Sequence, residues 1–199
     1  MKQTVLTILI LIVTMTTLFA FDGKKKGFLL GFGVGAAGVS YSQTIEGEGD
    51  SITSDTEEKG AFATDFKIGY APSNNLEIYY TNQVAWFTMH NALDDDTTIV
   101  DGVTAVGASY FLSQSPTDPT FKPSPFISFG LGLSSWSSMN NDGNAWTGVG
   151  YFLGVGYEFS KHNRISLNLF GNNPSIEESG VTFTTNSKAF LLTYSLMAY

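Results

Sequence analysis

The stretch from Gly148 to Ser160 reads GVGYFLGVGYEFS and decides the fold. Large apolar residues occupy its odd positions from Val149 to Tyr157, and glycines fill most of its even positions. A period of two places these two sets on opposite faces of a β-strand. A face made of glycine indicates a narrow, crowded interior, because the polar face of a soluble strand would carry charges instead. An apolar opposite face suits lipid, so the pattern is typical of a strand in a small membrane barrel.

The same alternation recurs along the chain and predicts seven further strands, at about 27–41, 62–70, 76–86, 99–112, 126–135, 164–170 and 189–199. Long loops and short turns alternate between them. We therefore predict an all-β fold, an eight-stranded antiparallel up-and-down transmembrane β-barrel with both termini on the turn side. Two phases stay open. The faces before Gly102 are unclear, and the alternation of the last strand points Tyr199 inward.

The composition excludes several classes of protein. Only 14% of the 199 residues are charged, whereas a soluble surface would be roughly a quarter to a third charged. Mean hydropathy is only +0.05, which disfavours a helical membrane bundle but fits the alternation of a barrel. The chain has no cysteine, so disulfides, thiolate metal sites and cysteine nucleophiles are excluded.

The N-terminus predicts export. Residues 1–20 form a secretory signal peptide with Lys2 as its charged start, an apolar run and Ala20 at the cleavage edge, which leaves 21–199 as the barrel domain. A retained anchor helix is the alternative, although its apolar run is short for a membrane span. Removing one Lys and no acid leaves a net charge of 9 − 18 = −9. Such an acidic chain is a poor ligand for nucleic acid.

Charge is distributed unequally between the two ends of the predicted barrel. The four predicted loops contain 12 of the 18 acids and a single base, Lys59. The turn side carries Lys24, Lys25, Lys26, Lys122, Lys161 and Arg164. We therefore expect acidic loops at one end of the barrel and a basic rim at the other.

At this level the chain resembles the small eight-stranded outer-membrane barrels of the OmpA/OmpX type in Gram-negative bacteria. The resemblance rests on the signal peptide, on strands such as PFISFGLGLS and GVGYFLGVGYEFS, and on the terminal aromatic Tyr199. It implies a location in the cell outer membrane, with both termini periplasmic and with outer-membrane lipid and lipopolysaccharide as surroundings. It also implies that the barrel assembly machinery reads Tyr199. The Ser113–Ser124 connection is longer than the periplasmic turns of the family.

Some eight-stranded barrels modify lipid A, so the two histidines are candidate catalytic residues. His90 lies in the second loop with no serine nearby in sequence. His162 and Ser160 have the two-residue spacing of the deacylase relatives, but they lie at the turn end, whereas those enzymes act near the outer leaflet. We therefore predict no enzymatic activity and no cofactor.

Other candidate sites are weak. Asp94, Asp95 and Asp96 could bind Ca²⁺ or Mg²⁺ through carboxylate oxygens, but no EF-hand spacing accompanies them and a solvated loop is the favoured interpretation. The three tryptophans fall at the loop-side ends of strands. Trp86 is in phase with the lipid face, while Trp136 and Trp146 are out of phase and either cap the lumen or fold into the loops.

Four charged residues fall on predicted inward faces near the turn side. The register across the turns places Lys67 diagonal to Glu77 and lets Glu158 meet Arg164, so we hypothesise two ion pairs that plug the lumen.

The leading functional prediction is a structural or interaction protein that presents acidic extracellular loops to an unspecified partner. The alternatives are a narrow channel or carrier of small apolar molecules, a lipid-A-modifying enzyme, and a soluble barrel of lipocalin type. Eight strands leave an interior just wide enough for side chains, which weighs against an aqueous pore.

Overall fold

The computed structural model describes residues 25–90, 96–118, 120–139 and 145–199; the predicted signal peptide lies outside these ranges. Within them the chain forms strands and connections, and no helix there is long and apolar enough to cross a membrane. The strands are β1 (Gly27–Gly47), β2 (Asp50–Thr53), β3 (Glu57–Ser73), β4 (Leu76–His90), β5 (Asp96–Phe111), β6 (Ser124–Ser138), β7 (Trp146–Ser160), β8 (Asn163–Asn172), β9 (Ser175–Glu178) and β10 (Val181–Ala198).

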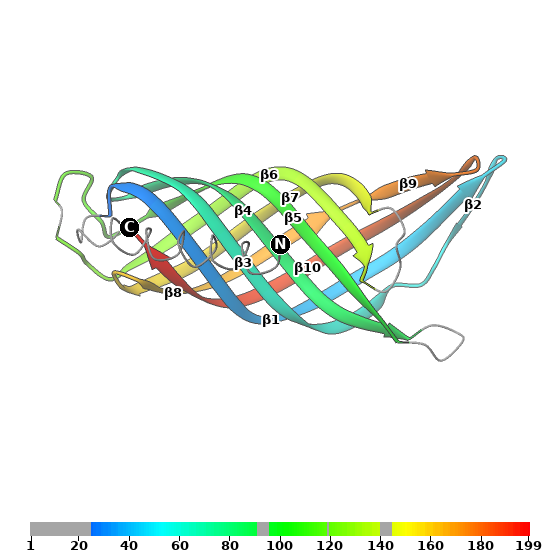
Figure 1. Cartoon of the computed structure of the whole chain (residues 1–199), viewed down its shortest axis with the longest axis horizontal. Helices are drawn as coiled ribbons and strands as arrows, with labels where there is room; N and C mark the ends of the chain where they lie inside the picture. Colours follow the sequence, from blue (N-terminus) through cyan, green and yellow to red (C-terminus); the bar gives the residue numbers. More distant parts are fainter. Residues whose placement is uncertain (1–24, 91–95, 119, 140–144) are drawn as a thin grey trace, which may run out of the picture.

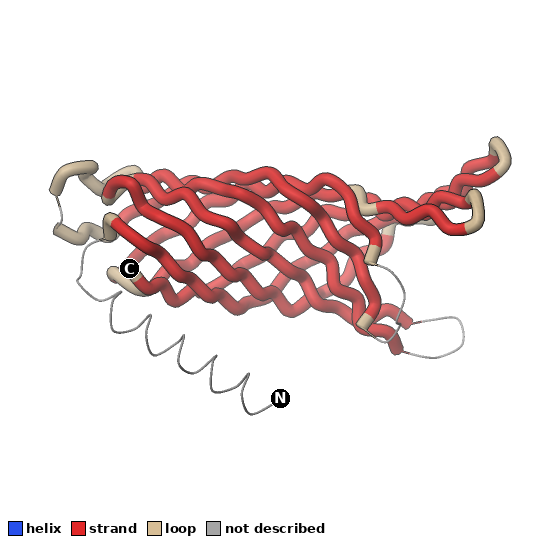
Figure 2. Tube along the Cα trace, turned by 45° about the horizontal axis from the view of Figure 1, so that its top comes forward, coloured by secondary structure: helices blue, strands red, loops and turns tan. Residues whose placement is uncertain are grey.

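Eight of these strands close into a ring. Their order is β1-β3-β4-β5-β6-β7-β8-β10, and antiparallel pairing of β1 with β10, from Leu30 opposite Ala198 to Glu46 opposite Thr182, completes it. β2 and β9 lie outside the ring, on β1 and β10. The chain is therefore an eight-stranded antiparallel up-and-down β-barrel, as predicted (Figures 1 and 2).

The two faces of the wall differ as the alternation predicts. Outward residues are large, apolar and exposed: Leu131 is 70% exposed, Val149 66% and Val106 64%. Exposed tyrosines, Tyr70, Tyr110, Tyr157 and Tyr194, gather on the outside near the turn end. Inward residues are buried, and several of them are glycines. Phe152 occupies the interior over Gly107 and Gly130, where an added Cβ would lie 2.7 and 2.3 Å from its ring.

The register decides the two face assignments that the sequence left open, before Gly102 and in the last strand. Asp101 is fully buried and points inward, because it lies opposite Trp136 on β6 and Ala85 on β4. In β10 the apolar residues from Phe190 to Leu196 face outward, and Tyr199 turns into the barrel with only 7% of its surface exposed.

The predicted loops at 44–60 and 172–180 are largely strand. Pairing of β1 with β10 continues past the apolar belt, and the hairpins β1–β2 and β9–β10 add one strand on each side. Each hairpin turns through two residues of positive φ, Glu48 and Gly49 in one and Ser179 and Gly180 in the other. The result is a four-stranded sheet, β2-β1-β10-β9, that projects from the loop end and is here called the paddle (Figure 1, right).

Candidate functional site

A buried cluster of charged side chains closes the turn end of the lumen. It consists of Lys25, Glu77, Glu158, Arg164 and Tyr199, here called the turn-end cluster. Glu77 and Glu158 are fully buried, and Arg164 is 2% exposed. The alternation of β4, β7 and β8 places Glu77, Glu158 and Arg164 on the inner face of the wall. Tyr199, which follows β10, continues the inward phase of that strand.

Arg164 is the centre of this cluster. Its Nη1 donates to Glu77 Oε2 at 2.9 Å while Nη2 contacts Oε1, and its Nε donates to Glu158 Oε1 at 3.1 Å. The Tyr199 hydroxyl lies within 2.9 Å of Glu77 and 2.8 Å of Glu158. Lys25 completes the cluster through an ion pair with Glu158. Two carboxylates therefore balance two cations.

The Arg164–Glu77 pair joins two opposite sides of the ring. In the strand order of the barrel, β4 and β8 are four strands apart in both directions, so they lie opposite each other. A bidentate contact between them therefore crosses the lumen. The Phe111 and Phe126 rings, 5.0 and 5.5 Å from the guanidinium carbon of Arg164, fill space beside it. The cross-section is thus occupied by side chains at this level.

The structure partly changes the predicted ion pairs. Glu158 and Arg164 lie opposite each other across the β7–β8 turn and are in contact. The expected pairing of Lys67 with Glu77 is wrong, because the register shifts between Tyr70 and Ser73 and places Lys67 opposite Thr81, four residues from Glu77. Lys67 forms its ion pair with Asp65 instead, two residues away on the same face of β3. Asp65 is buried and also accepts a hydrogen bond from Thr81. Sequence reasoning missed Lys25, Asp65 and Tyr199 as partners, although the inward phase of Asp65 was readable from the alternation.

A second polar network crosses the lumen nearer the loop end. Asp101 on β5 accepts a hydrogen bond from Asn172 on β8 at 2.8 Å and another from Ser187 on β10. β5 and β10 are also opposite strands of the ring. Around this carboxylate lie buried polar atoms without a protein partner, on Gln83, Ser134, Asn172 and Thr185. The contacts of Asp101 with Asn172 and Ser187 therefore form a second obstruction of the lumen.

Three aromatic side chains cover the lumen at the loop end. The rings of Tyr41, Phe87 and Trp136, from β1, β4 and β6, have centroids 5.2–5.7 Å apart. Trp136 thus caps the lumen, which is one of the two placements expected for it. Trp146 packs against Phe183 of the paddle, the other expected placement. Trp86 is half-buried and donates to Thr64.

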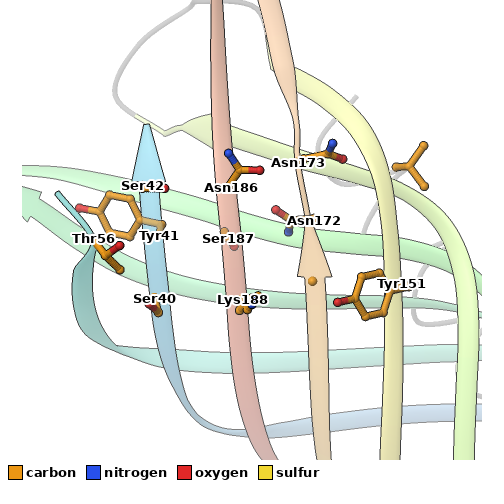
Figure 3. A pocket seen from close by; sticks show the side chains of 12 residues that line it. Ser40, Tyr41, Ser42, Thr56, Tyr151, Asn172, Asn173, Asn186, Ser187 and Lys188 are labelled. Atoms are coloured by element: carbon orange, nitrogen blue, oxygen red, sulfur yellow. The ribbon is translucent and has the colours of Figure 1, made fainter. Parts of the chain in front are cut away.

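A pocket of about 500 Å³ lies at the loop-side end of the wall, where β8 stops at Asn172 (Figure 3). Strands β1, β7, β8 and β10 surround it. Lys188 is the charged residue of its lining, and the remainder includes hydroxyl and amide side chains from Ser40, Ser42, Thr56, Asn172, Asn173 and Asn186. This pocket has no counterpart in the sequence-based prediction, because its walls come from four strands.

No family model matches the sequence, and no curated protein is significantly similar to it. Solved structures do resemble this chain. The outer membrane protein OprG from Pseudomonas aeruginosa is 12% identical, with 88% of this chain and 98% of that chain covered and a TM-score of 0.49. The outer membrane protein AlkL is 13% identical (88% and 92% covered, TM-score 0.49), and Neisserial surface protein A is 15% identical (84% and 96%, TM-score 0.47).

Of the two histidine candidates, the structure describes the side chain of His162. The Nδ1 atom of His162 lies 2.8 Å from the Met197 carbonyl oxygen, and Ser160 accepts a hydrogen bond from Asn163 instead. His90 ends β4, and its side chain lies outside what the structure describes.

The acidic triplet is only partly visible. Asp94 and Asp95 lie outside the described residues, whereas Asp96 begins β5 opposite His90. Among the described side chains, no group of three His, Cys, Asp or Glu residues is arranged to hold a metal.

Proposed function

We propose that this chain is an outer-membrane barrel with a sealed lumen, whose role is to hold an acidic, structured surface element outside the cell. The continuous belt of exposed apolar residues supports the membrane location. In a water-soluble barrel of lipocalin type, residues such as Leu131 and Val149 would form an apolar surface far larger than soluble monomers expose. A flanking row of tyrosines at the turn end is the girdle expected at a membrane interface.

The observation that carries the sealed lumen is the Arg164–Glu77 pair between opposite strands. Channel function would require a continuous aqueous path, but this pair and its aromatic neighbours occupy the interior. The Asp101 network and the Tyr41–Phe87–Trp136 group obstruct it again further along. These three layers favour an anchor over a channel or a carrier.

Planar-bilayer recording tests the sealed lumen. We expect purified protein to show no steady single-channel conductance. Steady ohmic channels from the unmodified protein would remove the sealed-anchor proposal and promote the channel.

The orientation has an independent test. The acids gather at the loop end and exposed bases such as Lys122 and Lys161 at the turn end, so we propose that the loop end faces outward and both termini are periplasmic. Because the chain has no native cysteine, single cysteines at Ser51 and at Lys161 give clean probes. An impermeant maleimide should label Ser51→Cys on intact cells and Lys161→Cys only after lysis. The opposite pattern would invert the proposed topology.

A further inference from the structure

The paddle carries an apolar row that the membrane does not explain. In the register, Ile52 of β2 lies opposite Ile45 of β1, Ile45 lies opposite Phe183 of β10, and Phe183 lies opposite Ile176 of β9. Residues directly opposite each other in antiparallel strands share one face of the sheet. Four apolar side chains from four strands therefore form one continuous row, here called the ladder.

The ladder lies well outside the apolar belt. Ile45 is roughly 30 Å further along β1 than Ala36, the last apolar residue of the outward alternation, at about 3.3 Å per residue. Ile52 is nevertheless 73% exposed and Ile45 45% exposed. Trp146 packs against Phe183 and supports the middle of the ladder, with ring centroids 6.0 Å apart.

The opposite face of the paddle is polar. Thr44 lies opposite Thr53 on one side and Thr184 on the other, and Glu46 lies opposite Ser51 and Thr182. The paddle is therefore amphipathic. Its ladder face continues the inward face of β1 and β10, and Phe183 packs there against Trp146 beside the buried core, whereas Ile45 and Ile52 remain exposed. An exposed apolar face on such an element is a signature of an interaction surface.

The acidic residues on the ladder face indicate what kind of partner could bind there. One step nearer the tips, Asp50 lies opposite Gly47 and Glu178 lies opposite Val181, so an exposed carboxylate stands at each side of the same face. Segments 43–56 and 173–186 together hold six acids and no Lys or Arg. A second copy of the paddle and an anionic glycolipid would both be repelled. A polypeptide with apolar side chains next to Lys or Arg would match both the row and its acidic border.

We propose that the ladder face of the paddle is a docking surface for a cationic amphipathic polypeptide segment. This inference rests on the proposed function only in requiring the paddle to be accessible outside the cell. The four ladder positions receive apolar side chains of the partner, and Asp50 and Glu178 pair with its basic residues. Trp146 and Phe183 form the fixed part of the site, since they continue into the barrel wall, and Ile52 on the edge strand forms its outer part.

The test uses the full barrel in zwitterionic nanodiscs, with empty nanodiscs as background. The probe is a fluorescently labelled synthetic peptide in which Leu and Lys alternate. Its two controls are a Leu/Glu peptide and a Ser/Lys peptide of the same length. We expect saturable binding of the Leu/Lys peptide only, weakened by salt. Equal binding of the Ser/Lys peptide would reduce the effect to attraction between charges and overturn the docking site.

Variants locate the binding on the ladder face. Ile52→Ser with Ile45→Ser should raise the Kd of the Leu/Lys peptide about tenfold, because two apolar contacts are lost. The matched control on the opposite face, Thr44→Ser with Thr182→Ser, should leave the Kd unchanged. Asp50→Asn with Glu178→Gln should weaken binding and flatten its dependence on salt. Unchanged binding by the Ile52/Ile45 variant would overturn the proposal.

Two further outcomes identify other occupants. Ile52 lies on β2, outside the closed ring, so Ile52→Ser should leave the barrel folded. Peptide binding to this single variant therefore tests the ladder even if the double variant fails to fold. Dimerisation of the unmodified barrel that Ile52→Ser abolishes would assign the ladder to a second copy. Protection of 43–53 from hydrogen exchange by lipopolysaccharide, but not by the Leu/Lys peptide, would assign it to glycolipid. Either outcome removes the proposed partner, whereas failure of the cysteine labelling would remove only the surface orientation.

Discussion

At the scale of single residues, Arg164 shows why the interior tolerates full charges. It is almost completely buried, yet two carboxylates and a tyrosine hydroxyl surround its guanidinium group. Burying a charge is costly when it stands alone and tolerable when it is paired and hydrogen-bonded. The balanced composition of the turn-end cluster, two acids and two bases, is therefore what allows it to fill the lumen.

Removal of one charged member of the turn-end cluster should destabilise the barrel, because it leaves an opposite charge buried without its partner. Glu77→Ala leaves Arg164 with a single carboxylate that it shares with Lys25, and we expect a loss of roughly 3–5 kcal/mol in the free energy of unfolding. Glu77→Ala combined with Arg164→Met removes one acid and one base and should cost less than Glu77→Ala alone. Urea titration of the folded barrel in liposomes measures both. Additive costs would show that Glu77 and Arg164 do not act as a pair.

Gly154 tests the crowding of the interior. A Cβ at this position would lie 1.9 Å from Asn168 Oδ1 and 2.6 Å from Ser128 Oγ, which are side-chain atoms from the two neighbouring strands. Gly154→Ala should therefore destabilise the barrel by about 1–3 kcal/mol through overpacking. Adding Asn168→Ala should restore part of that loss, again by urea titration. A tolerated Gly154→Ala would contradict tight packing of the lumen around this position.

At the scale of elements, each barrel strand has one face for lipid and one for the lumen, and β6 gives the sharpest contrast. Leu131 is 70% exposed on the outer face, whereas Ser128 is 5% exposed on the inner face. Leu131→Arg should cost roughly 2–4 kcal/mol if the residue lies near the bilayer midplane. Ser128→Ala should cost little, because its one hydrogen bond, to Asn168, is long at 3.5 Å. Equal tolerance of the two changes would contradict the face assignment.

The paddle is an element of a different kind. β1 and β10 serve the barrel with one part of their length and the paddle with the other, so the paddle is held by two strands that are already fixed in the wall. Such continuity favours a rigid projection over a mobile loop. It also places the ladder at a constant distance from the membrane.

At the scale of the whole molecule, closure depends on the last strand. Tyr199 follows β10, the strand that closes the ring on β1, and it also contributes a hydroxyl to the turn-end cluster. Deletion of Tyr199 should reduce assembly in cells and leave precursor or degraded chain in the periplasm, as the resemblance to outer-membrane barrels implies. Tyr199→Phe separates the two roles, because it keeps the terminal aromatic and removes the hydroxyl. We expect normal amounts of Tyr199→Phe in the membrane, and equal losses for both variants would contradict an assembly signal.

Closure also predicts a simple measurement on the intact protein. Every backbone polar group in the wall of a closed barrel is paired, which makes unfolding in detergent slow. The protein should fractionate with outer membranes and migrate faster on SDS gels before boiling than after. A soluble protein with the same mobility in both conditions would remove the membrane location.

The sequence by itself determined the eight strands of the ring, the alternating faces, the antiparallel order and the inward position of Lys67, Glu77, Glu158 and Arg164. A period of two is a local property, so it can be read from residues that are neighbours in sequence. The contact of Glu158 with Arg164 could also be predicted from the sequence, because only a short turn separates the two residues.

Only the tertiary structure decided which side chains meet across the lumen and what the polar loops become. Arg164 reaches Glu77 because β4 and β8 are opposite in the ring, and the diameter and stagger that set this contact belong to the closed barrel as a whole. Lys67 pairs with Asp65 because an irregularity between Tyr70 and Ser73 shifts the β3–β4 register and puts Thr81, rather than a neighbour of Glu77, opposite Lys67. The ladder was also hidden from the sequence, since Ile45, Ile52, Ile176 and Phe183 are isolated apolar residues in polar segments. They form one row only after β1 and β10 have paired.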